Sequence, residues 1–176
     1  MKQTIVALVE DKPGVLNRVA SLFRRRNFNI ESLTVGHTAT PGLSQMTLVV
    51  DTNRTNATLV QSNLYKLINV VDVQQVNKDD AVIREMALIK VRVTKDTRPE
   101  VIQLAEIFRG RIVDVALDAL VLEITGPEER VDRLIKMMEN FGIEELVRTG
   151  RVAMSRGKAE TTVVEKYLAR NGNGRK

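Results

Sequence analysis

A short polar turn near the N-terminus has the residue types of a small-molecule binding site. Residues 10–16 read Glu-Asp-Lys-Pro-Gly-Val-Leu and lie between an apolar extended run and an amphipathic helical pattern. A helix that opens at such a turn exposes backbone N–H groups at the positive end of its dipole, where carboxylates bind. Gly14 has no Cβ, so a small ligand can approach the backbone closely there. The turn therefore predicts an anion-binding site.

A second polar junction follows the predicted helix. Residues 27–33 read Asn-Phe-Asn-Ile-Glu-Ser-Leu and lead into the next apolar run. A site built from the turn that contains Asp11 and the junction that contains Asn29 suits an amino acid, which carries both a carboxylate and an ammonium group. A purely structural interpretation stays open for each residue. Gly14 can allow the backbone geometry of the turn, Asp11 can interact favourably with the helix dipole, and Asn29 can cap the junction.

Residues for other chemistry are scarce. The chain has no Cys and a single His, so we expect no disulfide, no thiolate chemistry and no transition-metal site, and we expect His37 to be an ordinary histidine. No nucleophile elbow, phosphate loop, HExxH motif or dinucleotide fingerprint occurs. An independent enzyme is therefore not expected.

Composition limits the class of protein further. The 176 residues suffice for one ordinary or two small domains, and 43% hydrophobic with 28% charged residues is typical of soluble proteins. No apolar run approaches the ~20 residues that span a bilayer, so we expect a cytoplasmic protein without membrane contact. Much of the net charge of +5 lies in residues 148–176, which favours either an acidic partner or simple solubility.

Hydrophobic periodicity predicts alternating strands and helices that occur twice in the same order. The first set is strand 3–10, helix 14–26, strand 29–38, strand 43–52, helix 55–68 and strand 70–77. The second set is strand 83–94, helix 99–109, strands 111–117 and 119–126, helix 128–140 and strand 143–154. The fold class predicted is α+β, with two tandem ferredoxin-like βαββαβ domains whose antiparallel sheets carry helices on one face. We place the domains at 1–78 and 81–157, followed by a tail at 158–176 that contains a short helix over 159–169.

The two copies differ at the candidate site. Alignment of the repeats places Pro99-Glu100 opposite Pro13-Gly14, 86 positions earlier. The side chain of Glu100 would fill the space that a ligand needs and repel its carboxylate. Only the first copy is therefore expected to bind an anion at this turn.

RNA-recognition domains also have the βαββαβ order, and they stack bases on aromatic residues of the central strands. The whole chain has four Phe, two Tyr and no Trp, and Phe23 and Phe108 fall on predicted helix stripes. We therefore expect no nucleic-acid partner. Apolar strands such as residues 46–50 and 88–93 instead favour oligomerisation through sheet edges or helix faces.

The turn at 11–16, with Asn29 after the helix, resembles the ACT domain, a small amino-acid-sensing module. Longer stretches resemble the regulatory (small) subunit of acetolactate synthase, also called acetohydroxyacid synthase. They run from Phe28 to Val35, from Arg84 to Val91, from Glu106 to Val115 and from Ser155 to Gly157. This resemblance extends from residue 2 to about residue 157, and it identifies 1–78 as an ACT domain and 81–157 as an ACT-like domain.

The resemblance implies a non-catalytic subunit that binds the catalytic (large) subunit and raises its activity. The partner would carry thiamine diphosphate, magnesium and FAD, and this chain would hold no cofactor. It further implies feedback inhibition by a branched-chain amino acid, usually valine, with leucine and isoleucine as alternatives that the sequence does not separate. The other hypothesis is a free-standing amino-acid-binding regulator of another enzyme or of transcription, although no helix-turn-helix segment occurs.

The family's effector site lies between the ACT domains of a homodimer. Carried over by the resemblance, residues Asp11, Gly14, Val15 and Leu16 of one chain would face Asn29 and Ile30 of the other. Many family members have Asn where this chain has Asp11. A carboxylate can hold the effector's ammonium group but cannot donate to its carboxylate, so the backbone N–H groups of Gly14 and Val15 are the donors we expect.

Overall fold

The computed structural model describes residues 2–52, 56–157, 164, 165 and 167–169, so Met1, residue 55 of the second predicted helix and most of the predicted tail helix lie outside the described residues. The chain forms two compact units. Residues up to Val82, together with the described residues from Ala153 onward, make the first unit, and Ile83–Val152 make the second. This grouping by contacts differs from the predicted limits of 1–78 and 81–157, which stay a prediction about sequence modules.

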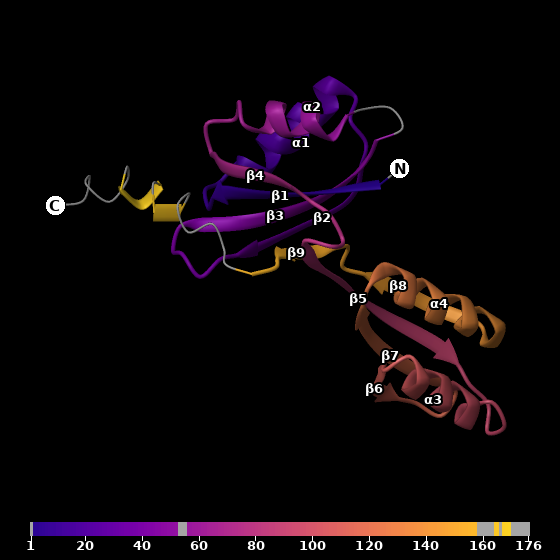
Figure 1. Ribbon diagram of the computed structural model, residues 1–176. Helices are drawn as coiled ribbons and strands as arrows, with labels where there is room; N and C mark the ends of the chain where they lie inside the picture. The colour runs from indigo at the N-terminus through magenta and orange to yellow at the C-terminus, as the bar shows by residue number, and fades with distance from the viewer. Residues whose placement is uncertain (1, 53–55, 158–163, 166, 170–176) are drawn as a thin grey trace. The chain divides into compact units, whose positions relative to one another are not determined.

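The first unit is an antiparallel sheet with two helices on one face (Figure 1). The strand order is β2-β3-β1-β4, so β2 and β4 are the edges. Its strands are β1 (Lys2–Glu10), β2 (Ile30–His37), β3 (Leu43–Asp51) and β4 (Val70–Val76), and its helices are α1 (Val15–Arg26) and α2 (Ala57–Leu64).

Alternation along β1 and the stripe of α1 explain the core of this unit. Every second residue of β1 from Ile5 to Val9 is buried on the side of the sheet that the helices cover, and the apolar side of α1 packs against these residues. The core residues of these two elements are Ile5, Ala7, Val9, Val15, Val19, Leu22 and Phe23. The rings of Phe23 and Phe28 pack edge to face at 5.7 Å. α1 ends where Asn27 takes a left-handed conformation (φ 54°) that stops the helix.

The second unit repeats the arrangement with strand order β6-β7-β5-β8. Its strands are β5 (Ala81–Arg92), β6 (Arg111–Val115), β7 (Ala119–Gly126) and β8 (Ile143–Arg148), and its helices are α3 (Arg98–Ile107), α4 (Glu128–Met138) and the 3-10 turn η1 (Glu139–Phe141). A further strand, β9 (Val152–Ser155), pairs with β5. The predicted fold class, two tandem ferredoxin-like α+β units, is confirmed.

Two predicted elements differ from the structure. The strand predicted over 143–154 breaks into β8 and β9, because Gly150 has a left-handed backbone (φ 81°) that interrupts the extended chain. The helix predicted over 55–68 ends at Leu64, and the chain then turns so that Ile68 is 86% exposed. The helical spacing of apolar residues continues to Ile68 in the sequence, so it predicted a helix end later than the one in the structure.

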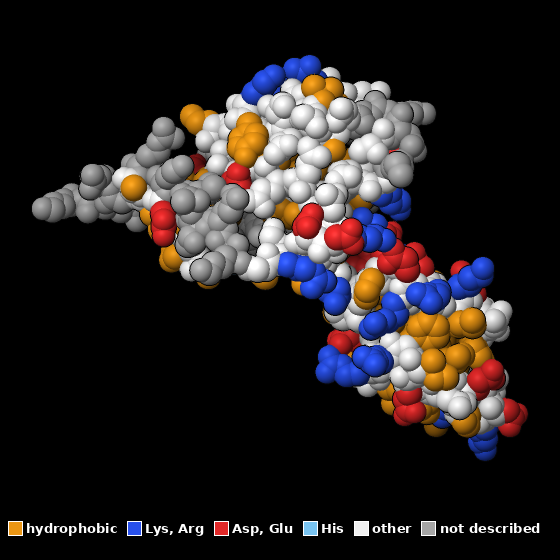
Figure 2. Space-filling view, viewed as in Figure 1, with side chains coloured by type: hydrophobic (Ala, Val, Ile, Leu, Met, Phe, Trp, Pro, Cys, Tyr) orange, Lys and Arg blue, Asp and Glu red, His pale blue; other side chains and the backbone are white. Residues whose placement is uncertain are grey.

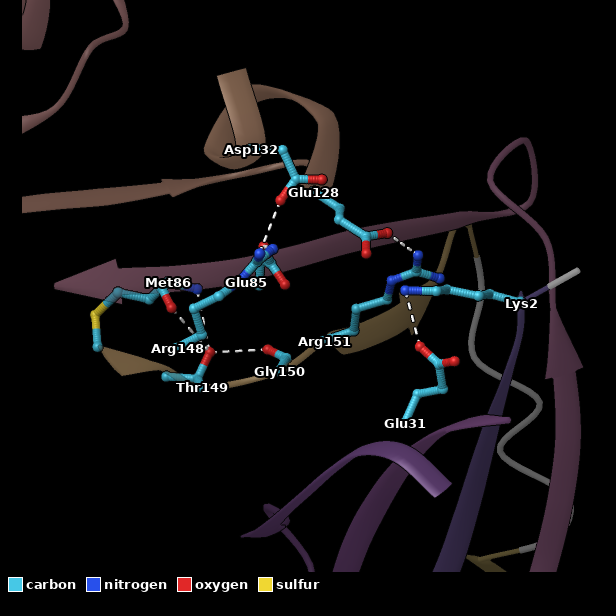
Figure 3. Close-up of polar contacts among 10 residues, drawn as sticks. All are labelled: Lys2, Glu31, Glu85, Met86, Glu128, Asp132, Arg148, Thr149, Gly150 and Arg151. Carbon is cyan, nitrogen blue, oxygen red and sulfur yellow. Dashed lines mark hydrogen bonds and ion pairs between the residues drawn. The ribbon is translucent and has the colours of Figure 1, made fainter. Parts of the chain in front are cut away.

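In the second unit, ion pairs connect β5 and α4 to the end of β8 and to the residues that follow it (Figure 3). The carboxylate of Glu85, which is 5% exposed, pairs with the guanidinium of Arg148. A second nitrogen of Arg148 lies 2.8 Å from Asp132 of α4, and Arg151 pairs with Glu128 at the start of α4. In the first unit, Lys2 and Glu31 form a separate pair at 2.8 Å.

Apolar side chains also lie on the outer surface of the second unit (Figure 2). Ile107 of α3 and Met137 of α4 are 65% and 45% exposed. Exposed apolar surface can mark an interaction site, and the expected oligomerisation stays a prediction. None of the helices within the described ranges is long and apolar enough to cross a membrane.

Candidate functional site

The predicted anion site is the turn between β1 and α1. β1 ends at Glu10, and the Asp11 N–H donates to the carbonyl of Gly42 at 2.8 Å, which anchors the turn to the β2–β3 hairpin. The Val15 N–H then donates to the carbonyl of Lys12 at 3.3 Å. Residues 11–14 are exposed, so the turn presents its backbone to solvent.

Gly14 is the N-cap of α1 and has a left-handed backbone with φ of 83°. Among the residues that the structure describes, none has an atom within 4 Å of a Cβ placed on Gly14, so these residues leave the space above it open. The first turn of α1 contains no acidic residue that would offset the positive end of its dipole. The structural interpretation of Gly14 is confirmed, because the turn has a glycine-like backbone there, and ligand binding above it stays a prediction.

Val15 lies in the core of the unit, whereas Leu16 lies at the surface beside the turn. Val15 is 4% exposed and belongs to the core of the unit, so only its backbone faces the turn. Its N–H, one of the two donors we expected, is already engaged by Lys12 over a long 3.3 Å. Leu16 is 47% exposed and offers apolar surface beside the turn.

Asp11 lies beside the chain's only histidine. Oδ2 of Asp11 is 3.3 Å from Nδ1 of His37, the last residue of β2, and their side chains are 48% and 84% exposed. The sequence analysis treated His37 as a histidine without a role in the site. The structure places it at the rim of the turn, because β2 and β1 both pair with β3 and end at the same edge of the sheet, where His37 and Val9 both pair with Ser44.

A polar network supports the turn from its base. The Glu10 carboxylate accepts from Asn69 Nδ2 at 2.6 Å and from the Tyr167 hydroxyl at 3.1 Å, and it lies 3.0 Å from Lys12 Nζ. Arg18 of α1 donates to Asn69 Oδ1. Lys12 first and then Asn69 hold the pKa of Glu10 below its ordinary value, against the opposing effect of burial. The sequence analysis did not predict this network. The feature of the sequence that could have indicated it is Asn69, a polar residue directly before an apolar strand.

Asn29 and Ile30 lie at the opposite end of the sheet from the turn. Ile30 pairs with Val50 near the start of β1, whereas His37 pairs with Ser44 near its end. The two ends of β2 are roughly 23 Å apart at about 3.3 Å per residue. Asn29 is exposed, and the helix cap is Asn27 instead. One amino acid therefore cannot touch both the turn and Asn29 within a single chain.

The corresponding turn of the second unit has a different geometry from the one predicted. α3 begins at Arg98 with Thr97 as its N-cap, so Glu100 is the third residue of the helix and does not precede it as Gly14 precedes α1. Thr94 and Thr97 exchange backbone-to-hydroxyl bonds of 2.9 and 3.2 Å that close the turn. Position-by-position equivalence of Gly14 and Glu100 was wrong, although Glu100 does add negative charge to the first turn.

In the part of the chain that the structure describes, no group of three or more His, Cys, Asp or Glu side chains is placed to hold a metal ion. The polar groups at the turn suit an organic ion instead. The exposed helix start suits a carboxylate, Asp11 suits an ammonium group, and Leu16 suits an apolar side chain.

Comparison with known proteins identifies relatives of the whole chain. A sequence family described as the ACT domain of the acetohydroxyacid synthase small subunit matches residues 5–72, and one described as the small subunit of acetolactate synthase matches residues 84–157. A probable acetolactate synthase small subunit from Archaeoglobus fulgidus is 50% identical over 157 residues, which cover 89% of this chain and 98% of that protein. The small subunit from Mycobacterium leprae is 47% identical over 88% of this chain and 91% of its own length.

A solved structure has the same fold. The crystal structure of the acetolactate synthase small subunit from Thermotoga maritima superposes with a TM-score of 0.83 at 42% identity. The superposition covers 90% of this chain and 99% of that one.

Proposed function

Because the chain belongs to the acetolactate synthase small-subunit family, we propose that it activates the catalytic large subunit and gives it feedback inhibition by a branched-chain amino acid. We take valine as the effector, with leucine and isoleucine as the alternatives to test. The cofactors expected for the reaction, thiamine diphosphate, magnesium and FAD, belong in this proposal to the large subunit.

The observation that carries the proposal is the position of the two half-sites at opposite ends of an edge strand. β2 is an edge of the first sheet, with Asp11 beside its last residue and Asn29 directly before its first. If two copies pair β2 with β2 antiparallel about a two-fold axis, each turn meets the Asn29 end of the partner. This arrangement would form two identical sites and would also cover the exposed edge strands.

The chemistry of each shared site follows from the described residues. The effector's carboxylate would lie over Gly14 at the positive end of α1, and its ammonium group would lie between Asp11 and the partner's Asn29. Its branched side chain would contact Leu16 and the partner's Ile30, which is only partly buried in the single chain. A pocket of this kind separates valine from leucine by only about 1–3 kcal/mol, the contribution of one methylene group.

Two measurements test the proposal. Calorimetric titration of the purified chain with valine, leucine and isoleucine should give saturable binding of at least one of them, with alanine as the matched control for the apolar side chain. Affinity capture should recover a large thiamine-diphosphate-dependent enzyme. Capture of a promoter or an unrelated enzyme instead, with amino-acid binding intact, would favour the free-standing regulator.

A further inference from the structure

The C-terminal segment of the chain returns to the candidate site. Residues 164, 165 and 167–169 are helical and belong to the first unit, although the family match ends at residue 157. The hydroxyl of Tyr167 donates to Oε1 of Glu10 at 3.1 Å. In Figure 1 this helical segment lies at the end of the sheet where β1 ends. A segment outside the family match therefore contacts the residue directly before Asp11.

The contact completes the support of the turn. Oε2 of Glu10 already binds Asn69 at 2.6 Å and Lys12 at 3.0 Å, so Tyr167 engages the other oxygen of the same carboxylate. The side chain of Glu10 is 15% exposed. Burial raises the pKa of the Tyr167 hydroxyl, and the adjacent Glu10 carboxylate raises it further, so the hydroxyl keeps its proton and acts as a donor.

The described residues of the segment leave the ligand side of the turn open. Residues 11–14 stay exposed, and no atom of a described residue lies within 4 Å of the Cβ position above Gly14. Tyr167 therefore binds the base of the turn and does not occupy the space in which a ligand would lie. A contact of this kind holds the backbone in one conformation before the ligand arrives, which reduces the entropy lost on binding.

We propose that the C-terminal segment around Tyr167 is an internal clamp of the β1–α1 turn that raises its affinity for the amino acid. The inference rests on the proposed function, because it concerns the same site. It adds a regulatory element that acts through the chain's own C-terminal residues. Removal of the Tyr167–Glu10 bond would loosen the turn and weaken effector binding without removing any group that touches the effector.

The test compares Tyr167→Phe with Tyr65→Phe in the full chain. Tyr65 is the matched control, because its hydroxyl also donates to a carboxylate, Asp72 of β4, at 2.6 Å within the same unit. Asp72 pairs with Leu8 of β1, so hydrogen exchange is compared over residues 11–20 only. Exchange and valine titration are measured for both variants, and for a chain shortened after residue 157. Tyr167→Phe and the shortened chain should exchange faster at the turn and bind valine about 2- to 10-fold more weakly, the effect of losing one hydrogen bond. Tyr65→Phe should leave both measurements at the turn unchanged.

Unchanged exchange at the turn in Tyr167→Phe overturns the clamp, and so does valine binding that is unchanged or tighter. If the unmodified chain binds no branched-chain amino acid, the proposed function fails separately. The exchange comparison then still decides whether Tyr167 holds the turn.

Discussion

Substitution of Gly14 tests the anion site most sharply when charge is separated from shape. Gly14→Asp and Gly14→Asn add side chains of nearly the same size at a position that is open and has φ of 83°. Both residues tolerate the left-handed backbone better than other side chains, so the backbone penalty is shared, at about 1 kcal/mol. Both variants should therefore unfold about 4–8 °C below the unmodified protein.

Only Gly14→Asp places a negative charge where the effector's carboxylate would bind. At a separation of about 4 Å, like charges cost about 1 kcal/mol in bulk water and about 4 kcal/mol at the effective dielectric of a protein surface. The valine affinity of Gly14→Asp should thus fall about 5- to 1,000-fold below that of Gly14→Asn. In the holoenzyme, Gly14→Asp should lose valine inhibition while it still activates the large subunit.

The assay is valine titration by calorimetry for both variants, together with thermal unfolding and the holoenzyme rate against valine concentration. If both folded variants bind valine as tightly as the unmodified chain, the placement of the carboxylate over Gly14 is refuted. If both lose the same amount of affinity, the effect comes from the added volume, and the electrostatic account is contradicted.

Three further predictions follow from the network, the ion pairs and the site count. The pKa of Glu10 is lowered in the folded state, so its contribution to stability is complete above the unfolded pKa and is lost as the pH falls through the folded pKa. Glu10→Gln should therefore be less stable than the unmodified protein at neutral pH. In denaturation curves recorded below about pH 5, the variant should lose less stability than the unmodified protein does. Arg148→Ala leaves Glu85 buried without its partner and should lower the free energy of unfolding by about 2–4 kcal/mol in urea denaturation. The control Arg92→Ala breaks the exposed pair with Glu144 and should change the free energy of unfolding by under about 1 kcal/mol. Valine should bind with a stoichiometry of about one per chain, because the turn of the second unit is closed by threonines; a stoichiometry of two would contradict this.

Local patterns predicted most of the fold. The alternation of β1 and the stripe of α1 are properties of a few neighbouring residues, and they sufficed for the βαββαβ order and for the turn that contains Gly14. The break at Gly150 was missed because a single residue with positive φ ended an extended run that has apolar residues on both sides, Leu146 and Val147 before it and Val152 and Ala153 after it. The start of α3 was predicted to within one residue, but Glu100 was matched to Gly14 wrongly, because the repeat was aligned by its proline, which lies before α1 but inside α3.

The base of the site depends on contacts that sequence spacing does not reveal. Asn69 and Tyr167 bind Glu10, and Arg18 binds Asn69, although these residues come from separate parts of the chain. The position of His37 beside Asp11 follows from the register of the β2–β3 hairpin, which fixes which ends of the strands are neighbours. Residue types at the turn were therefore predictable, but the groups that hold the turn were not.

Mixing two inactive variants tests the shared site most directly. Gly14→Asp damages the turn of a chain, and Asn29→Ala damages the half-site that the chain offers to its partner. A mixed dimer has one site with both defects and one site with neither. After the variants are unfolded together and refolded at equal amounts, about a quarter of the unmodified number of valine sites should return, since half of the dimers are mixed. If each site lay within one chain, no sites would return, and the two-fold arrangement through β2 would be contradicted.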